Sequence, residues 1–81
     1  LAAFKQYREA DGRFYFKLTA HDGSVLLQSR AFTEGREAGA WVKRLKTEGG
    51  PALAEAPADL PEGIERDRVE AALNALAAAQ D

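Results

Sequence analysis

Alternating apolar and polar positions predict a strand from residue 13 to residue 20. The even-numbered positions of this stretch are apolar: Phe14, Phe16, Leu18 and Ala20. The odd-numbered positions between them are amphipathic or polar: Tyr15, Lys17 and Thr19. Because side chains alternate between the two faces of a strand, this pattern indicates one covered face and one open face.

A second strand, over residues 24–31, follows a hairpin turn at Asp22-Gly23. A two-residue type I′ turn needs positive φ at both central positions, which Asp-Gly tolerates. The turn then sets four pairs, in which Ala20 faces Val25, Leu18 faces Leu27, Phe16 faces Ser29 and Phe14 faces Ala31. The apolar sets of the two strands match in this register.

Residues 3–9 form the first strand, and two loops could join it to the next one. A two-residue Asp11-Gly12 turn would pair Phe4 with Thr19 and bring Phe4 to the open face. A three-residue loop, with Gly12 in the left-handed conformation, instead pairs Phe4 with Leu18. We choose the three-residue loop, which places Gln6 opposite Phe16 on the covered face.

A helix is predicted from an N-cap at Thr33 to about Thr47. Its apolar stripe has i, i+3, i+4, i+7 spacing and is formed by Ala38, Trp41, Val42 and Leu45. Gly49-Gly50-Pro51 ends the helix. Gly35 and Gly39 inside it each cost about 0.5–1 kcal/mol relative to alanine.

Beyond Pro51 the chain becomes rich in Ala, Pro and Glu. We expect a linker over residues 49–66 with room for a short helix, and then a helix over residues 67–79 with Asp67 as its N-cap. The apolar line of that helix, Val69, Leu73 and Leu76, is short enough to dock only loosely. The predicted fold is therefore α+β: a three-stranded antiparallel meander with one helix on one face (residues 1–48) and a C-terminal helical tail.

Composition limits the function classes. The 81 residues contain no cysteine, no methionine and one histidine, and they suffice for one small domain. There is neither a signal pattern nor an apolar run long enough to span a membrane, so we expect a cytoplasmic chain without a metal, a cofactor or a membrane partner. The absence of an initiating methionine suggests a piece of a longer protein.

Catalytic patterns are missing as well. No Ser/His/Asp order, carboxylate pair, Gly-rich phosphate loop or metal-ligand spacing is present, and His21 lies in a predicted turn. We therefore expect this stretch to be no enzyme and to have no small-molecule substrate.

Charge directs attention to the open face of the sheet. Residues 1–48 hold nine Lys and Arg against six Asp and Glu, whereas residues 49–81 hold two against seven. The candidate binding residues on or beside this face are Lys5, Tyr7, Arg13, Tyr15, Lys17, Gln28 and Arg30, with Leu26 and Thr19 beside them. Tyrosines interleaved with cations are typical of sheets that stack RNA bases and contact phosphates. Two other interpretations stay open: an ordinary solvated face, or docking of a protein partner, including a second copy through an unpaired sheet edge.

Residues 12–45 resemble the YegP-like family of small bacterial proteins of unknown function. The resemblance rests on the runs GRFYFKLTA, DGSVLLQSRAF and AGAWVKRL, with pattern positions at Phe14, Phe16, Leu18, Gly23, Ser29, Phe32, Ala38 and Val42. The match extends over about the first 48 residues and implies a β-β-β-α module, often duplicated or assembled as a symmetric pair. Gln6 in place of an aliphatic residue, Trp41 in place of a small one, the single copy and the acidic tail depart from the pattern.

A single module with an Ala/Pro/Glu-rich tail also resembles the C-terminal extensions of certain bacterial tryptophanyl-tRNA synthetases. This second resemblance implies that the chemistry on ATP and tryptophan resides elsewhere in a longer ligase. We accordingly predict a non-catalytic accessory module that contacts tRNA or the parent enzyme's other domains. The alternative is a self-associating structural module with no role in nucleic-acid binding.

Overall fold

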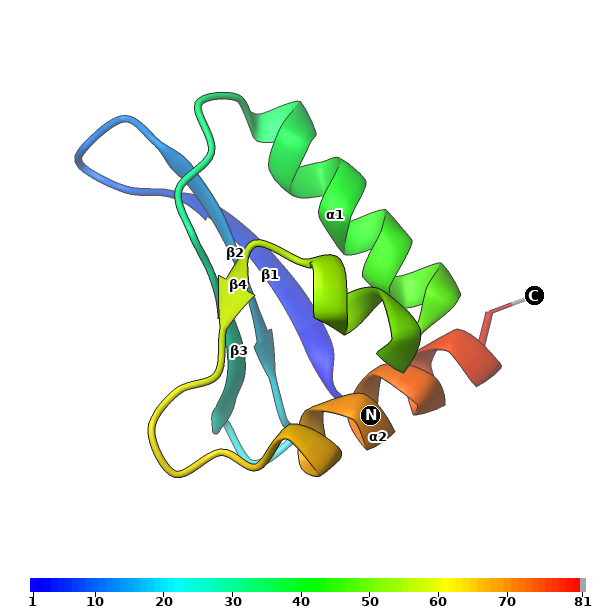
Figure 1. Ribbon diagram of the computed structural model, residues 1–81. Coiled ribbons are helices and arrows are strands. Elements are labelled where there is room, and N and C mark those ends of the chain that lie inside the picture. Colours follow the sequence, from blue (N-terminus) through cyan, green and yellow to red (C-terminus); the bar gives the residue numbers. More distant parts are fainter. Residues whose placement is uncertain (81) are drawn as a thin grey trace.

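A computed structural model describes residues 1–80 as two layers, a four-stranded antiparallel sheet and a layer of helices on one of its faces (Figure 1). The elements in chain order are β1 (Ala3–Arg8), β2 (Phe14–Thr19), β3 (Val25–Ser29), α1 (Gly35–Glu48), the 3-10 helix η1 (Gly50–Glu55), β4 (Ala58–Asp59) and α2 (Arg66–Ala78). The sheet order is β1-β2-β3-β4. The predicted α+β class, the meander and the helical tail are confirmed, and β4 adds a strand that the sequence pattern does not predict.

The first hairpin has the predicted three-residue loop. Phe4 pairs with Leu18 and Gln6 with Phe16. The Glu9 N–H donates to the carbonyl of Arg13 at 3.0 Å, and Gly12 has a φ of 81°. This left-handed conformation is what requires glycine at the third position of the loop.

The second hairpin has the same kind of loop, so the predicted type I′ turn is wrong. The Ala20 N–H donates to the carbonyl of Ser24 at 2.8 Å, which leaves three residues in the loop. Of these, only Gly23 has a positive φ. The Asp22 carboxylate accepts the Ser24 N–H at 2.9 Å, and this local bond favours an Asp with negative φ over the mirror-image turn.

A β-bulge in β3 corrects the register that this longer loop shifts. Thr19 pairs with Val25 but Leu18 pairs with Leu27, so Leu26 is the extra residue. Leu26 and Leu27 are 2% and 0% exposed, and both belong to the core. The prediction of Leu26 on the open face is therefore wrong, because the bulge turns its side chain inward.

The far ends of β2 and β3 also depart from simple pairing. Phe14 bridges to Phe32, where the sequence-based register placed Ala31. The buried hydroxyl of Ser29 accepts the Phe16 N–H at 2.8 Å. A side chain thus takes the place of a ladder carbonyl, and the backbone beyond it runs in a different register.

Helix α1 begins one residue later than predicted, with Glu34 and not Thr33 as its N-cap. The Glu37 carboxylate accepts the Glu34 N–H at 3.1 Å and the Thr33 hydroxyl at 2.9 Å. A carboxylate on the first turn satisfies a backbone donor that the helix leaves free. Of the predicted stripe, Ala38, Val42 and Leu45 are buried, while Trp41 is half-buried and packs against the core.

Residues 49–66, expected as a linker, carry η1 and β4. Leu53 of η1 is 6% exposed and joins the core. In β4, Ala58 pairs with Ser29 and Asp59 with Gln28. Strand β4 is only two residues long and has no apolar alternation, so no sequence period could have indicated it.

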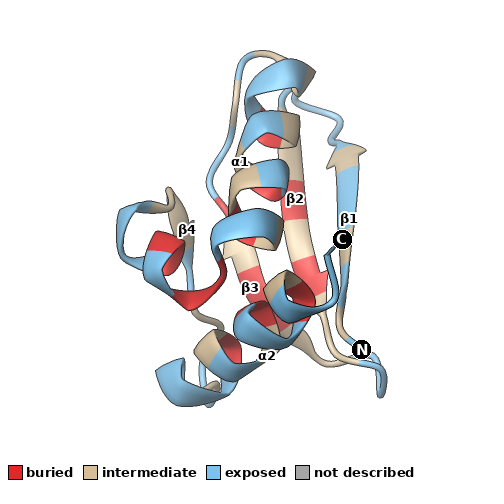
Figure 2. Cartoon of the chain, turned by 90° about the vertical axis from the view of Figure 1, so that its right-hand side faces the viewer, coloured by how far each residue is buried: buried red, intermediate tan, exposed pale blue. Residues whose placement is uncertain are grey.

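Helix α2 packs into the same core and not loosely beside it. It begins at Arg66 with Glu65 as its N-cap, so the predicted N-cap Asp67 is wrong. Its predicted apolar line is confirmed, since Val69 and Leu73 are 0% exposed and Leu76 is 7% exposed. Buried residues gather where α1, α2 and η1 face β2 and β3 (Figure 2).

Candidate binding face of the sheet

The helices cover one face of the sheet and leave the other uncovered (Figure 1). Phe16 and Leu18 point toward the helices and are fully buried, whereas Tyr15 and Lys17, at the alternate positions, are half-buried. The predicted assignment of covered and open faces is therefore confirmed. The open face is referred to below as the tyrosine face and comprises Lys5, Tyr7, Tyr15, Lys17 and Gln28.

Two tyrosines stack at the centre of the tyrosine face. Tyr7 on β1 is directly opposite Tyr15 on β2, and their rings lie 5.6 Å apart at an interplanar angle of 17°. The Gln28 amide donates to the Tyr7 hydroxyl at 2.7 Å, and the Lys17 Nζ lies 5.5 Å from the centre of the Tyr7 ring. Side chains from β2 and β3 thus fix the Tyr7 ring of β1 in place.

The Tyr15 ring is held from the first hairpin loop. Its hydroxyl donates to the Asp11 carboxylate at 2.7 Å, and the same carboxylate accepts the Arg13 N–H at 2.8 Å. These bonds, the one from Tyr15 first, lower the pKa of Asp11. The same bond raises the pKa of Tyr15, because it favours the protonated phenol beside a carboxylate.

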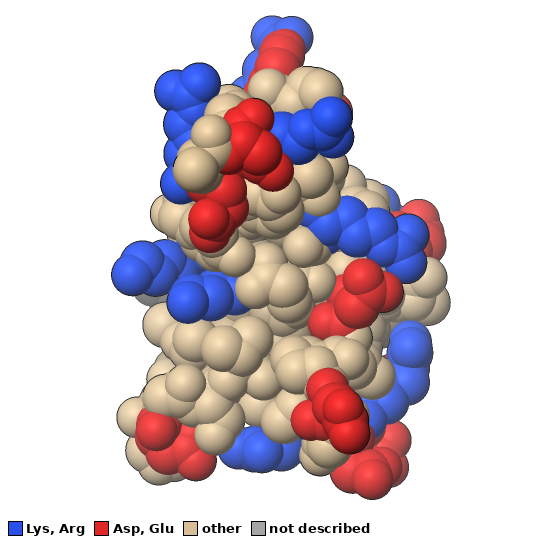
Figure 3. All heavy atoms as spheres, turned by 90° about the vertical axis from the view of Figure 1, so that its left-hand side faces the viewer, with Lys and Arg blue, Asp and Glu red and all other residues tan. Residues whose placement is uncertain are grey.

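The positive charge of the tyrosine face is confined to two lysines. Lys5 and Lys17 lie opposite each other on β1 and β2. Arg30, however, forms an ion pair with Asp59 of β4 at 3.1 Å, and its hydrogen bond to that carboxylate raises the pKa of Arg30. Figure 3 shows this side of the molecule with basic and acidic groups around a broad uncharged area.

Five of the seven predicted binding residues share this face: Lys5, Tyr7, Tyr15, Lys17 and Gln28. Arg13 lies directly after the first hairpin loop, where its carbonyl accepts the Glu9 N–H, and Arg30 is paired with Asp59 of β4. Sequence reasoning missed Asp11 and Asp59 as partners of these residues. The position of Asp11 in a predicted turn, four residues before Tyr15, could have indicated that the two side chains meet. Nothing in the sequence indicated that Asp59 would lie beside Arg30.

A shallow hollow of about 470 Å³ lies over Tyr7, Asp11, Tyr15 and Gln28. Its lining offers hydrogen-bond donors and acceptors as well as aromatic surface. Within residues 1–80 no group of three His, Cys, Asp or Glu side chains is placed to hold a metal ion. Over the same residues no helix has the length and hydrophobicity to cross a membrane.

The fold and this face define a small α+β module that presents an open aromatic sheet surface. The chain is similar to segments of curated proteins named tryptophan–tRNA ligase. It is 43% identical over 76 residues to the one from Xanthomonas axonopodis pv. citri, a match that covers 94% of this chain and 17% of that protein. It is 56% identical over 46 residues to the one from Xylella fastidiosa, covering 57% of this chain and 11% of that protein.

A third relative, the tryptophan–tRNA ligase of Pseudomonas syringae pv. tomato, is 45% identical over 58 residues, which are 72% of this chain and 13% of that protein. The chain therefore spans between about a tenth and a sixth of the length of these relatives. No family model matches the chain. No solved structure matches it significantly either. The resemblance to the YegP-like family stays a prediction.

Proposed function

We propose that this chain is an accessory domain of a tryptophan–tRNA ligase and that its tyrosine face contacts tRNA. The observation that carries the proposal is the stacked Tyr7–Tyr15 pair beside Lys5 and Lys17, on a face left open by the helices, in a chain that resembles such a ligase over 94% of its length. The ligation chemistry is assigned to the rest of that protein.

The geometry supports contact with an unpaired or splayed base. Aromatic rings stack bases at about 1–3 kcal/mol per base, whatever the base. The outward side of the stacked tyrosines would provide the platform, and Lys5 and Lys17 would lie within reach of the adjoining phosphates. With Arg30 paired to Asp59, about three cations remain for phosphates, namely Lys5, Lys17 and Arg13.

The small number of free cations sets the expected salt dependence of binding. If about three phosphates are contacted, the logarithm of the binding constant falls with the logarithm of salt concentration with a slope of roughly 2–3. Binding is then weak at physiological salt and clear at low salt. Such a module would add to the affinity of a larger enzyme and would not supply affinity alone.

The test is an NMR titration of the ¹⁵N-labelled chain with tRNA at low salt. We expect shifts at Tyr7, Tyr15 and Lys17 that disappear at high salt. Lys17→Glu should remove them, whereas Lys43→Glu on α1, which changes net charge equally on the other side of the sheet, should leave them. Equal effects of the two variants would mean that only net charge matters and would refute the assigned face.

A full-length ligase that contains this segment provides the second readout. Lys17→Glu should raise the KM for tRNA and leave the activation of tryptophan with ATP unchanged. An unchanged KM would remove tRNA contact from the proposal. A loss of tryptophan activation would show instead that the segment supports the catalytic part of the enzyme.

A further inference from the structure

Strand β1 forms an open edge of the sheet and borders the tyrosine face, to which it contributes Lys5 and Tyr7. Among the strands of residues 1–80 it pairs with β2 alone. The Glu9 N–H bonds to the Arg13 carbonyl, so in this antiparallel pair the hydrogen-bonded positions of β1 are the odd-numbered ones. The backbone groups of Phe4, Gln6 and Arg8 consequently point away from the sheet, where another strand could bond to them.

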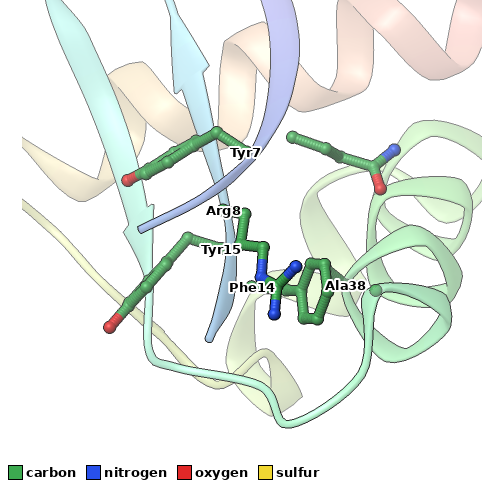
Figure 4. A pocket seen from close by; sticks show the side chains of 7 residues that line it. Tyr7, Arg8, Phe14, Tyr15 and Ala38 are labelled. Atoms are coloured by element: carbon green, nitrogen blue, oxygen red, sulfur yellow. The ribbon is translucent and has the colours of Figure 1, made fainter. Parts of the chain in front are cut away.

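Two hollows that share Gln6 lie along this edge between β1 and α1, and together they are called the groove below. One end is a hollow of about 400 Å³ lined in part by Gly35 of α1. Figure 4 shows Arg8 and Phe14 in its lining together with Tyr7 and Tyr15 of the tyrosine face. The other end is a hollow of about 360 Å³ lined in part by Gly39 and Lys43, and Gln6 lines both ends. The groove thus follows the same length of chain as the free backbone edge.

Two glycines allow side chains of the sheet to pack closely against α1 beside this groove. A Cβ atom on Gly35 would lie 3.3 Å from the ring of Phe14, and one on Gly39 would lie 3.4 Å from the Gln6 side-chain oxygen. Apolar side chains line both hollows, with Phe14 and Ala38 in the first and Val42 in the second. The close approaches to Gly35 and Gly39 also give a reason for glycines that are unfavourable inside a helix.

The charged residues that line the groove are all positive. Arg8 lines the first hollow and Lys43 and Lys46 line the second, whereas no Asp or Glu of residues 1–80 lines either. Neither lysine forms an ion pair with another residue in that part of the chain. Arg8 lies over the Phe14 ring, 5.2 Å from its centre, with its guanidinium at the mouth of the hollow (Figure 4).

We propose that the β1 edge binds an extended peptide segment that carries carboxylates and adds a fifth strand to the sheet. Its backbone would bond to Phe4, Gln6 and Arg8, an apolar side chain would enter the groove near Gln6, and acidic side chains on either side would meet Arg8 and the α1 lysines. The free positions span about 14 Å, so a segment of five to seven residues suffices.

A second copy of this chain fits the edge less well. A twofold axis through Gln6 would place Phe4 opposite the partner's Arg8 and would bring the Arg8 end of one groove against the Lys43 and Lys46 end of the other. Like charges that face each other across strands are destabilising. A carboxylate-bearing segment meets the same cations with opposite charge.

The test uses two synthetic seven-residue probes with blocked ends, Thr-Glu-Thr-Val-Thr-Glu-Thr and its lysine counterpart, Thr-Lys-Thr-Val-Thr-Lys-Thr. With the acidic probe we expect saturable NMR shifts centred on Phe4, Gln6 and Arg8. Amide hydrogen exchange at these positions should slow tenfold when the probe is at about nine times its dissociation constant. The lysine probe should produce neither effect.

Variants of the edge and of the groove separate the two parts of the proposal. Gln6→Pro removes the central outward N–H without removing a bond to β2, and it should abolish binding, whereas Gln6→Ala should retain it. Lys43→Glu combined with Lys46→Glu should reverse the preference between the probes, a result that does not depend on whether the proline variant folds.

Three outcomes would overturn the proposal: an equal response to both probes, binding of the acidic probe that survives Gln6→Pro in a folded chain, or an unchanged preference after the charge reversal. Light scattering at increasing protein concentration tests whether a second copy of the chain binds to this edge. Concentration-dependent dimers with the same three amides protected in the absence of any probe would assign this edge to self-association and would also overturn the proposal.

Discussion

The position of α2 leads to a specific prediction for Leu73→Ala. Leu73 is 0% exposed and lies in the core that α2 shares with α1, η1 and the sheet. The Asn74 side chain next to it accepts the Gly50 N–H at 2.8 Å and so ties α2 to the segment after α1. If this packing is correct, the C-terminal helix is required for the stability of the whole domain.

The expected magnitude follows from burial. Replacing a fully buried leucine by alanine lowers the free energy of unfolding by about 2–5 kcal/mol, through lost burial and the cavity that remains. A domain of this size has a total stability of about 4–12 kcal/mol. The variant should therefore lose a large fraction of its stability, and the loss should be equal when it is followed by the secondary structure of the whole chain or by a probe on α1.

Urea unfolding followed by circular dichroism and by the fluorescence of Trp41 on α1 measures the effect. The matched control is Ala75→Gly, an exposed position of the same helix, which should lose only about 1 kcal/mol through helix propensity. Two separate transitions, or a loss below about 1 kcal/mol for Leu73→Ala, would show that α2 is an independent appendage and that its docking is incorrect.

Three further predictions concern single contacts. Ser29→Ala should lose about 1–3 kcal/mol in urea unfolding, because the buried Phe16 N–H that its hydroxyl accepts would be left without a partner; an unchanged midpoint would contradict this bond. Gly49→Ala should destabilise by about 1–3 kcal/mol in thermal unfolding, since φ is 75° there and the new Cβ would lie 2.8 Å from a side-chain oxygen of α2. Tyr15→Phe should raise the pKa of Asp11 toward its ordinary value of 3.8 in a carboxyl NMR titration. A carboxyl group whose pKa is lowered by folding stabilises the folded state at pH values above its unfolded pKa, and this stabilisation is lost as the pH falls through its folded pKa. The variant should therefore also lose less stability on acidification.

In the two hairpins, local hydrogen bonds set the conformation of the loop, whereas tertiary packing sets the register of the strands. Both carry Asp-Gly at the same place, and in both the Asp carboxylate accepts a backbone N–H two residues on. The sequence-based analysis treated them differently because it fitted each to the apolar pattern of its strands. In the second hairpin the bulge at Leu26 restores that pattern, which a period-two analysis cannot anticipate.

Part of the candidate site could be predicted from the sequence, and part could be seen only in the structure. The alternation from Phe14 to Thr19 was enough to place Tyr15 and Lys17 on the open face, and the loop length after Arg8 was enough to bring Tyr7 opposite Tyr15. The pairing of Arg30 with Asp59 was beyond reach, because 29 residues separate them and β4 has no pattern of its own. This single pair reduces the positive charge available on the tyrosine face.

The sequence by itself determined the class of fold, the strands of the meander, the buried face of each helix and the face on which the tyrosines lie. These follow from residue periodicity and turn chemistry, which act over a few neighbouring positions. Only the tertiary structure decided that α2 completes the core, that β4 extends the sheet beyond β3 and that β1 forms an open edge beside a cationic groove. Those features depend on which distant segments bury surface together, and no local period records such a choice.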